Sequence, residues 1–230
     1  MHIAVKAVAA VGMLTLSASI ATAQGTVSGT LSLEERAGAD RGDLHSAVVY
    51  LEPRERAIPV NDVPAMRSRV IAMHGREFRP HVAIVLAGGS VAFPNEDPFS
   101  HNVFSNVDLG PFDLGLYRRG ATRAATFARP GVYPIYCNIH SMMVSFVVAV
   151  PTPWATQPDE AGRFTLRGVP AGRYVIHAWH EHGAREVTRD LLVTDSGAEV
   201  QLAIDARTYV EAPHLNKFGR PYSLIRDDRY

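Results

Sequence analysis

The chain has very little cysteine: Cys137 is the only one among 230 residues, so no internal disulfide can form. A single cysteine is a partner for another chain, a free thiol or a metal ligand. In an oxidising compartment an exposed free thiol would be a liability. Cys137 therefore needs an explanation from its neighbours in the sequence.

Excess charge of one sign is also absent. Lys and Arg together number 23, Asp and Glu number 23, and the formal net charge is zero. Nucleic acids and acidic membrane surfaces attract clustered basic residues, whereas those of this chain are scattered. We therefore expect neither nucleic acid nor an acidic membrane surface as a partner.

Long apolar runs are missing after the N-terminal segment. Residues 7–20 form an apolar run behind Lys6, and Ala21-Thr22-Ala23 offers the small-x-small pattern that signal peptidases cut. The alternative is a membrane anchor, but the run is shorter than the roughly 20 residues that span a bilayer. The pattern predicts a cleaved signal peptide over residues 1–23, a periplasmic location and no membrane span.

The chain contains no convincing amphipathic helix. Its 18 Gly and 15 Pro separate short runs of alternating apolar residues, as in an all-β sandwich or barrel. The predicted strands cover residues 25–33, 47–51, 69–74, 78–86, 91–93, 122–127, 132–136, 143–150, 163–166, 173–179, 186–193 and 199–204. We predict an all-β fold with one large or two small domains.

The segment Cys137-Asn138-Ile139-His140-Ser141-Met142-Met143 carries the most chemistry. It places a thiol, an imidazole and a thioether in a tight loop between two predicted strands, and a second imidazole, His101, lies upstream. Thiolate, two imidazoles and a weak thioether form a ligand set that suits copper in both oxidation states. Zinc is the alternative metal, but a neighbouring methionine would have no role in a zinc site.

Each of these residues has a simpler explanation when taken alone. His101 could be a loop histidine near the surface, Cys137 a small buried apolar residue, and Met143 a core residue. Their order and spacing together favour a copper site made of His101, Cys137, His140 and Met143. Met142 is a second thioether in the same loop and remains an alternative to Met143.

Residues 78–150 resemble a cupredoxin, the family of blue copper proteins of the plastocyanin and amicyanin type. The segments that carry the resemblance are Asn95-Glu96-Asp97, His101-Asn102-Val103, Phe112-Asp113, Pro130-Gly131-Val132-Tyr133 and residues 137–143. The resemblance implies a Greek-key β-sandwich, one type 1 copper and one-electron transfer. The C-x-x-H-x-x-M spacing is that of amicyanin, which favours Met143 over Met142 as the axial ligand.

The flanking regions resemble a second family, the carboxypeptidase regulatory-like or transthyretin-like β-sandwich. The matching segments are Val27-Ser28-Gly29-Thr30 and residues 47–51, 159–164 and 168–174. The resemblance implies a module without catalytic function. The overall arrangement is similar to bacterial plastocyanin-like proteins of the methylamine-utilisation type.

The strand count suggests how the two modules are arranged. Residues 24–58 supply two predicted strands, too few to bury a face independently. We predict that these residues and 151–205 form one discontinuous sandwich, and that a cupredoxin domain, residues 65–150, is inserted into it. The competing arrangement is three domains in a row. The sequence leaves open whether the tail, residues 206–230, packs on a domain or is mobile.

The predicted function is that of a one-electron carrier with an unidentified redox partner protein, not an enzyme. Multicopper oxidases join their copper centres through a His-Cys-His run, whereas Tyr136 and Asn138 flank Cys137 here. A copper-dependent oxidoreductase with a substrate site between the two domains is one alternative, and the pair His180 and His182 could then help to form a second metal site, although a solvated strand end explains the pair more simply. A copper-delivery protein without a redox partner is the remaining alternative. The sequence does not determine the oligomeric state.

Overall fold

The computed structural model describes residues 24–38, 42–55 and 63–222. In this part of the chain, strands β1–β17 are joined by loops and two short 3-10 helices, η1 (Leu44–Ser46) and η2 (Pro64–Met66). The all-β prediction is confirmed. The predicted signal peptide, part of the predicted 24–58 segment and residues 223–230 of the tail lie outside the described residues.

The middle of the chain forms one β-sandwich, called here the middle sandwich. A five-stranded sheet in the order β6-β12-β11-β8-β9 faces a three-stranded sheet in the order β10-β7-β3, next to the hairpin β4-β5. Its strands are β3 (Ser68–Val70), β4 (Ala72–His74), β5 (Glu77–Arg79), β6 (Val82–Leu86), β7 (Gly89–Pro94), β8 (His101–Ser105), β9 (Phe112–Tyr117), β10 (Thr122–Phe127), β11 (Gly131–Tyr136) and β12 (Val144–Val150). Alternating residues of both sheets, such as Phe93, Ile135 and Val147, form the core between them.

Residues from both ends of the described chain form the second sandwich, called here the flanking sandwich. The sheet β13-β2-β15-β16 faces the sheet β14-β1-β17. The strands are β1 (Gln24–Glu34), β2 (Val48–Pro53), β13 (Ala155–Thr156), β14 (Arg163–Pro170), β15 (Gly172–Trp179), β16 (Val187–Val193) and β17 (Ala198–Asp205). β1 runs antiparallel to β14 and parallel to β17, and β2 pairs with β13 and β15. Strands that precede the middle sandwich therefore share sheets with strands that follow it.

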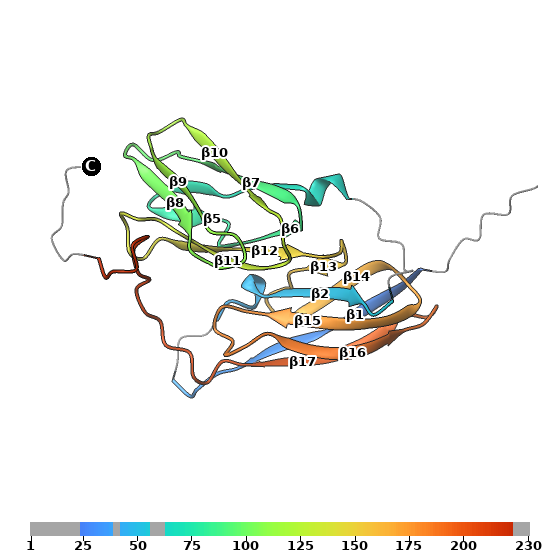
Figure 1. The fold of residues 1–230 in the computed structure, drawn as a ribbon. Helices are drawn as coiled ribbons and strands as arrows, with labels where there is room; N and C mark the ends of the chain where they lie inside the picture. The colour runs from blue at the N-terminus through green and yellow to red at the C-terminus, as the bar shows by residue number, and fades with distance from the viewer. Residues whose placement is uncertain (1–23, 39–41, 56–62, 223–230) are drawn as a thin grey trace, which may run out of the picture.

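The two sandwiches pack face to face through a third apolar cluster. Side chains of a strand alternate between its two faces, so β2 sends Val49 and Leu51 into the flanking core while Val48 and Tyr50 point the other way. The buried members of this interface are Val48, Tyr50, Val82, Ile84, Leu86, Val148 and Val150. Figure 1 shows the result: β11 and β12 of the middle sandwich lie over β2 and β15 of the flanking one.

Two predicted strands differ from the observed ones. The predicted strand over residues 78–86 is divided into β5 and β6, because Pro80, which follows a cis peptide bond, cannot donate to a sheet. The predicted strand over residues 69–74 is likewise divided into β3 and β4. β8, β9 and β13 are not among the strands predicted from the sequence. In the described residues no helix is long and apolar enough to cross a membrane.

Candidate metal centre

The topology of the five-stranded sheet brings His101 and Cys137 to the same end. β8 and β11 are antiparallel neighbours, with Phe104 opposite Tyr136. His101 begins β8 and Cys137 directly follows the end of β11. Because antiparallel neighbours place the start of one strand beside the end of the other, the two side chains meet at one edge of the sandwich.

Residues 137–143 form the loop that connects β11 to β12, called here the ligand loop. The Cys137 amide donates to the Met143 carbonyl over 3.2 Å, which closes the loop at its base. The Met143 amide donates to the His140 carbonyl over 3.1 Å, which forms a turn within it. Such a turn is needed because successive residues of a continuous strand would point to opposite faces.

Three ligand atoms converge at this edge of the sandwich. The Nδ1 atoms of His101 and His140 lie 3.7 and 3.6 Å from the Sγ of Cys137. In the described part of the chain, these residues are the one group of three His, Cys, Asp or Glu whose ligand atoms lie within 4.8 Å of one another. A soft sulfur beside two imidazole nitrogens is a donor set that fits copper.

Asp97 fixes the orientation of the His101 ring. The His101 Nε2 donates to the Asp97 Oδ2 over 2.7 Å, and both side chains are buried. With the proton on Nε2, the lone pair of Nδ1 faces Cys137. A carboxylate bonded to the outer nitrogen of a histidine is a common support for metal ligation, because it sets both tautomer and ring angle.

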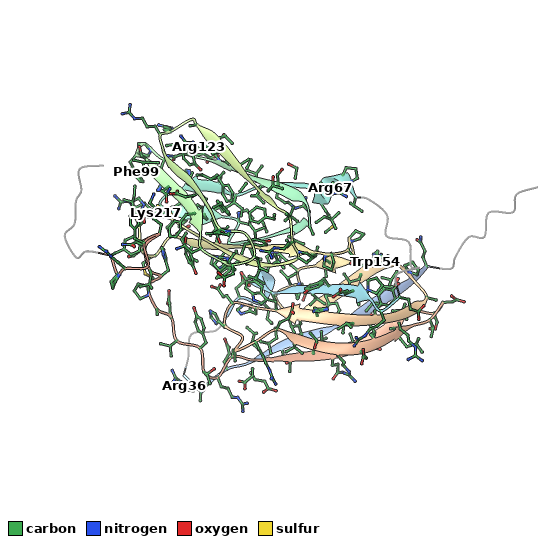
Figure 2. The ribbon with its side chains drawn as sticks, viewed as in Figure 1. Arg36, Arg67, Phe99, Arg123, Trp154 and Lys217 are labelled. Atoms are coloured by element: carbon green, nitrogen blue, oxygen red, sulfur yellow. The ribbon has the colours of Figure 1, made fainter. Side chains whose placement is uncertain are left out.

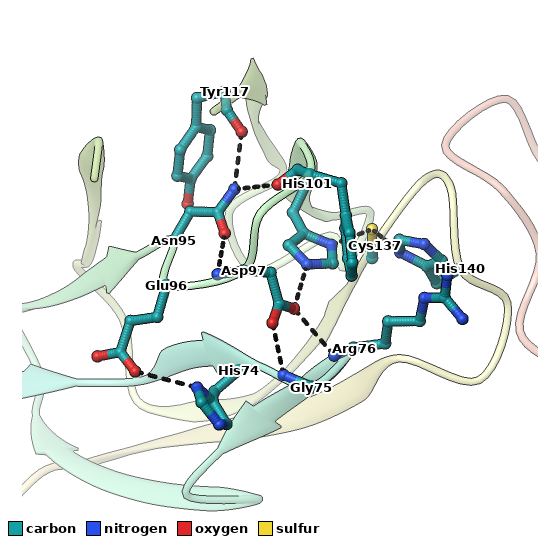
Figure 3. Close-up of polar contacts among 11 residues, drawn as sticks. His74, Gly75, Arg76, Asn95, Glu96, Asp97, His101, Tyr117, Cys137 and His140 are labelled. Atoms are coloured by element: carbon teal, nitrogen blue, oxygen red, sulfur yellow. Dashed lines mark hydrogen bonds and ion pairs between the residues drawn. The ribbon is translucent and has the colours of Figure 1, made fainter. Parts of the chain in front are cut away.

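Asp97 is itself held by a tight turn between β4 and β5. The backbone amides of Gly75 and Arg76 donate to its two carboxylate oxygens over 2.6 and 2.9 Å, as Figure 3 shows. Both turn residues have positive φ, 67° and 63°, as a two-residue type I′ hairpin turn requires. The Asp97 amide also donates to the Asn95 side chain over 3.0 Å. The hairpin β4-β5 thus holds the carboxylate of Asp97, which in turn orients His101.

Burial sets the protonation states of the candidate ligands without metal. It lowers the pKa of His101, against the opposing effect of Asp97, and lowers the pKa of His140 to about 4 with a further contribution from the charge of His101. Burial raises the pKa of the Cys137 thiol, although the amides of Asn102, Ile139 and His140 act in the other direction. At neutral pH both imidazoles are therefore neutral, the form that binds metals.

The two candidate thioethers occupy different environments. Met143 is 1% exposed and belongs to the core of the middle sandwich, whereas Met142 is 61% exposed. Phe99 packs on both imidazoles, with its ring centroid 5.1 Å from that of His101 and 5.8 Å from that of His140. Among the two methionines, Met143 is the one enclosed with Cys137.

The other histidines near the two sandwich edges have different partners. The His180 Nε2 bonds the Asp43 carbonyl over 3.1 Å, and its Nδ1 accepts from the His182 amide over 3.0 Å, so both ring nitrogens are engaged. The two histidines follow the end of β15, and His180 is buried, so the expectation of a solvated strand end is wrong for it. His81 lies 2.5 Å from Glu181, and His74 3.5 Å from Glu96.

An open cavity of about 650 Å³ lies between the two sandwiches beside the ligand loop. Ser141 and Met142 of the loop line one side of it, Glu181 and His182 of the flanking sandwich another. Tyr209 and His214, in the segment after β17, line a third side.

Sequence reasoning missed the residues that support the site. Asp97 belongs to a segment that resembles the cupredoxins, but nothing in its spacing assigned it to His101. The turn Gly75-Arg76 and the residues after β17 carried no signal, because their roles depend on contacts distant in sequence.

No family model matches the chain, and no curated protein matches it. Parts of the chain are similar to solved structures. A copper-containing nitrite reductase from Thermus scotoductus SA-01 is 25% identical over 43% of this chain, with a TM-score of 0.34, and the match spans only 25% of the reductase. A purple cupredoxin from Nitrosopumilus maritimus is 23% identical over 36% of this chain and 99% of its own, with a TM-score of 0.33. Amicyanin from Paracoccus versutus is 21% identical over 44% of this chain and 98% of its own, with a TM-score of 0.35.

Proposed function

We propose that the protein binds one type 1 copper ion through His101, Cys137, His140 and Met143 and acts as a one-electron carrier. The observation that carries this proposal is the convergence of the Cys137 sulfur with two imidazole nitrogens in a buried site. Bound copper would supply a one-electron couple in this donor set.

The chain's own residues hold the site in place before any metal enters. Asp97 orients the ring of His101. The backbone hydrogen bond from the Cys137 amide to the Met143 carbonyl closes the ligand loop, and the core of the middle sandwich encloses Met143. A site held rigidly in this way changes little between oxidation states, which keeps the reorganisation during electron transfer small. These constraints favour a carrier over a site that must open for a substrate.

His140 is the candidate exit for electrons. It is half-buried, whereas His101 is fully buried, and Met142 and Pro98 near the site are exposed. A redox partner protein could therefore approach the His140 edge over an apolar surface. A charged residue in place of Met142 should slow transfer to such a partner more than it changes the spectrum.

Export to the periplasm is part of the proposal. It is supported by the signal-peptide pattern of residues 1–23 and by the single cysteine, which suits an oxidising compartment when it serves as a metal ligand.

The direct test is the visible spectrum after addition of Cu(II). The wild-type protein should develop an intense thiolate-to-copper absorption and turn blue or green. Cys137→Ala should abolish the colour because the thiolate is the electron donor of that transition, and His101→Ala should weaken or alter it. A colourless wild-type protein with an intact thiol would refute the proposal.

A copper-dependent oxidoreductase is the second candidate function, favoured by the cavity beside the ligand loop. A copper-delivery protein without a redox partner is the third. Consumption of oxygen or nitrite at enzymatic rates by the copper-loaded protein would favour the oxidoreductase. Fast electron self-exchange without turnover would favour the carrier over both alternatives.

A further inference from the structure

Residues 206–222, called here the C-terminal strap, leave the flanking sandwich after β17 and reach the middle sandwich. In Figure 1 they form the red segment that runs beside both sandwiches. The strap is anchored first on the flanking sandwich, where the Tyr209 ring stacks on His182 with centroids 3.7 Å apart and planes 13° apart. It therefore starts from a fixed point outside the middle sandwich.

The strap next packs on the strand that leads into the ligand loop. The His214 ring stacks on Tyr136, the last residue of β11, with centroids 4.3 Å apart. The ring of Phe104 also lies against His214, with the two ring centroids 6.3 Å apart. Burial lowers the pKa of His214, while the carbonyls of Leu215, His140 and Met143 oppose that shift. The imidazole thus lies against the end of β11, directly before the ligand loop.

Two residues of the strap bond the first two residues of the ligand loop. The Tyr222 hydroxyl donates to the Cys137 carbonyl over 2.6 Å. The Lys217 amide donates to the Asn138 side chain over 2.9 Å, and its ammonium group pairs with Asp113 at 2.6 Å. Figure 2 shows Lys217 on the side of the middle sandwich.

A local turn shapes the strap for these contacts. The Asn216 side chain accepts from the amides of Phe218 and Arg220 over 2.9 and 3.1 Å. Gly219 takes a φ of 71° in this turn, a conformation that glycine adopts without a steric penalty. Lys217 and Tyr222 are thereby held on the loop side by bonds within the strap itself.

We propose that the C-terminal strap positions the ligand loop and that Tyr222 is a positioning residue acting through the Cys137 carbonyl. The base of the loop is otherwise closed by one backbone hydrogen bond, from the Cys137 amide to the Met143 carbonyl, and by the turn at His140. The phenol adds a second constraint at the residue that carries the thiol, and Lys217 adds a third next to it. The strap thus makes the geometry of Cys137 depend on a segment of the flanking half of the chain.

The first test uses the metal-free full-length protein and so does not depend on the proposed function. Tyr222→Phe removes the hydroxyl and keeps the ring. Amide hydrogen exchange in residues 137–143 should become roughly threefold to tenfold faster, the change expected when one hydrogen bond is lost. A chain that ends at residue 208 should show at least the same increase, while β1 and β14 stay protected. Unchanged exchange in the loop of both variants would overturn the proposal.

The second test rests on the proposed function and uses the protein loaded with Cu(II). Tyr222→Phe should change the relative intensities of the thiolate-to-copper bands, because the Cys137 backbone is less constrained. Leu215→Ala is the matched control, since Leu215 lies in the strap and is 52% exposed, and it should change neither readout. Faster exchange with an unaltered spectrum would overturn the positioning role. Failure of the wild type to bind copper would refute the proposed function. The hydrogen-exchange measurement on the metal-free protein would then be the test of whether the strap positions the ligand loop.

Discussion

His101 is held on two sides by different kinds of contact. Its Nε2 is bonded to the buried Asp97, and its ring packs against the edge of Phe99. Asp97 in turn accepts two backbone amides from the turn at Gly75 and Arg76. Burial works against ionisation of this carboxyl, yet the hydrogen bonds from Arg76, His101 and Gly75 outweigh it and lower its pKa. Asp97 is therefore a carboxylate acceptor for three donors.

Replacement of Asp97 by asparagine should weaken the metal site although none of the candidate ligand residues is changed. An amide has one acceptor oxygen, so at least one buried donor loses its partner, at a cost of about 1–3 kcal/mol of folding stability. Copper affinity should fall roughly 10- to 100-fold, as is typical when the outer partner of a ligating histidine is removed. Urea unfolding of the metal-free protein and competition with a copper chelator measure the two effects.

The exposed Asp108 provides the control for this variant. Asp108→Asn should change neither stability nor affinity. If Asp97→Asn binds copper as tightly as wild type, the hydrogen bond to His101 does not orient the ring.

The two methionines of the ligand loop should respond differently to truncation. Met143 lies in the core, so Met143→Ala should destabilise the metal-free protein by about 2–5 kcal/mol. It should retain copper and shift the reduction potential, because an axial thioether bond is long and weak. Met142→Ala should change stability by about 0.5 kcal/mol or less, since the side chain is exposed. Chemical unfolding and voltammetry test both variants, and a shifted potential in Met142→Ala alone would reverse the axial assignment.

At the scale of elements, the start of β6 is tied to the loop that follows β15. His81 precedes β6 and pairs with Glu181 over 2.5 Å, and its ring also meets the edge of Phe146. The hydrogen bond that His81 donates to Glu181 raises the pKa of His81, and the attraction of Asp43 adds to this, although burial opposes it. Burial alone would raise the pKa of Glu181, but the bond and charge of His81 lower it overall. This pair is an ionic contact at the margin of the apolar interface.

The pH dependence of this contact follows from the two shifts. Because the pKa of His81 is raised, this residue stabilises the fold at pH values below 6.5, the ordinary pKa of histidine. That contribution is lost as the pH rises through the folded-state pKa. The lowered pKa of Glu181 stabilises the fold above its ordinary value of 4.5 and is lost as the pH falls through its folded-state pKa. The pair therefore contributes most near pH 4.5–6.5, by at most about 1 kcal/mol, because His81 is partly exposed.

Glu181→Gln should accordingly lower the Tm of the metal-free protein more at about pH 5.5 than at about pH 9. Glu96→Gln is the control, because the pair of Glu96 with His74 is more than half exposed on both sides. Its effect on Tm should be small at both pH values. An equal loss of Tm at the two pH values in Glu181→Gln would show that the pair is not ionic.

At the scale of the whole molecule, the contact between the two sandwiches buries the outer faces of β2, β6 and β12. β2, β6 and β12 each place one set of side chains in the core of their own sandwich and the other set in the interface. The two sandwiches thus present continuous apolar faces to each other. The pairing of β1 and β2 with β14, β17, β13 and β15 supports the proposed discontinuous sandwich of residues 24–58 and 151–205, with residues 65–150 inserted as a second module.

Fragments of the chain test this division. Residues 151–205 alone should fail to fold, because their two sheets lose β1 and β2, which pair with four of their strands. Residues 65–150 alone should fold but self-associate, because an interface face of large apolar residues becomes exposed. Size-exclusion chromatography and circular dichroism distinguish these states.

A substituted fragment separates folding from association. The changes Val82→Thr, Ile84→Thr and Val148→Thr keep β-branched side chains while making the interface face more polar. This variant of residues 65–150 should be monomeric and develop the thiolate-to-copper absorption with Cu(II). An unfolded substituted fragment would contradict the two-module division.

The sequence by itself determined the all-β fold and the chemical character of the candidate site. Strand periodicity and turn residues are local properties, so alternation and the spacing of Gly and Pro were sufficient for the fold class. The order of Cys137, His140 and Met143 is likewise local, because these residues share one loop. The ligand set stays a prediction, although the structure brings the ligand atoms of His101, Cys137 and His140 together.

Only the tertiary structure decided which residues support the site and how the two halves meet. Asp97 is held by amides 21 and 22 residues away, and Tyr222 reaches a carbonyl 85 residues away. A sequence pattern carries no distance between such positions. The apolar residues of β6 and β12 do not by themselves identify the surface that covers their outer faces. That surface is supplied by β2, which is adjacent to them only after folding.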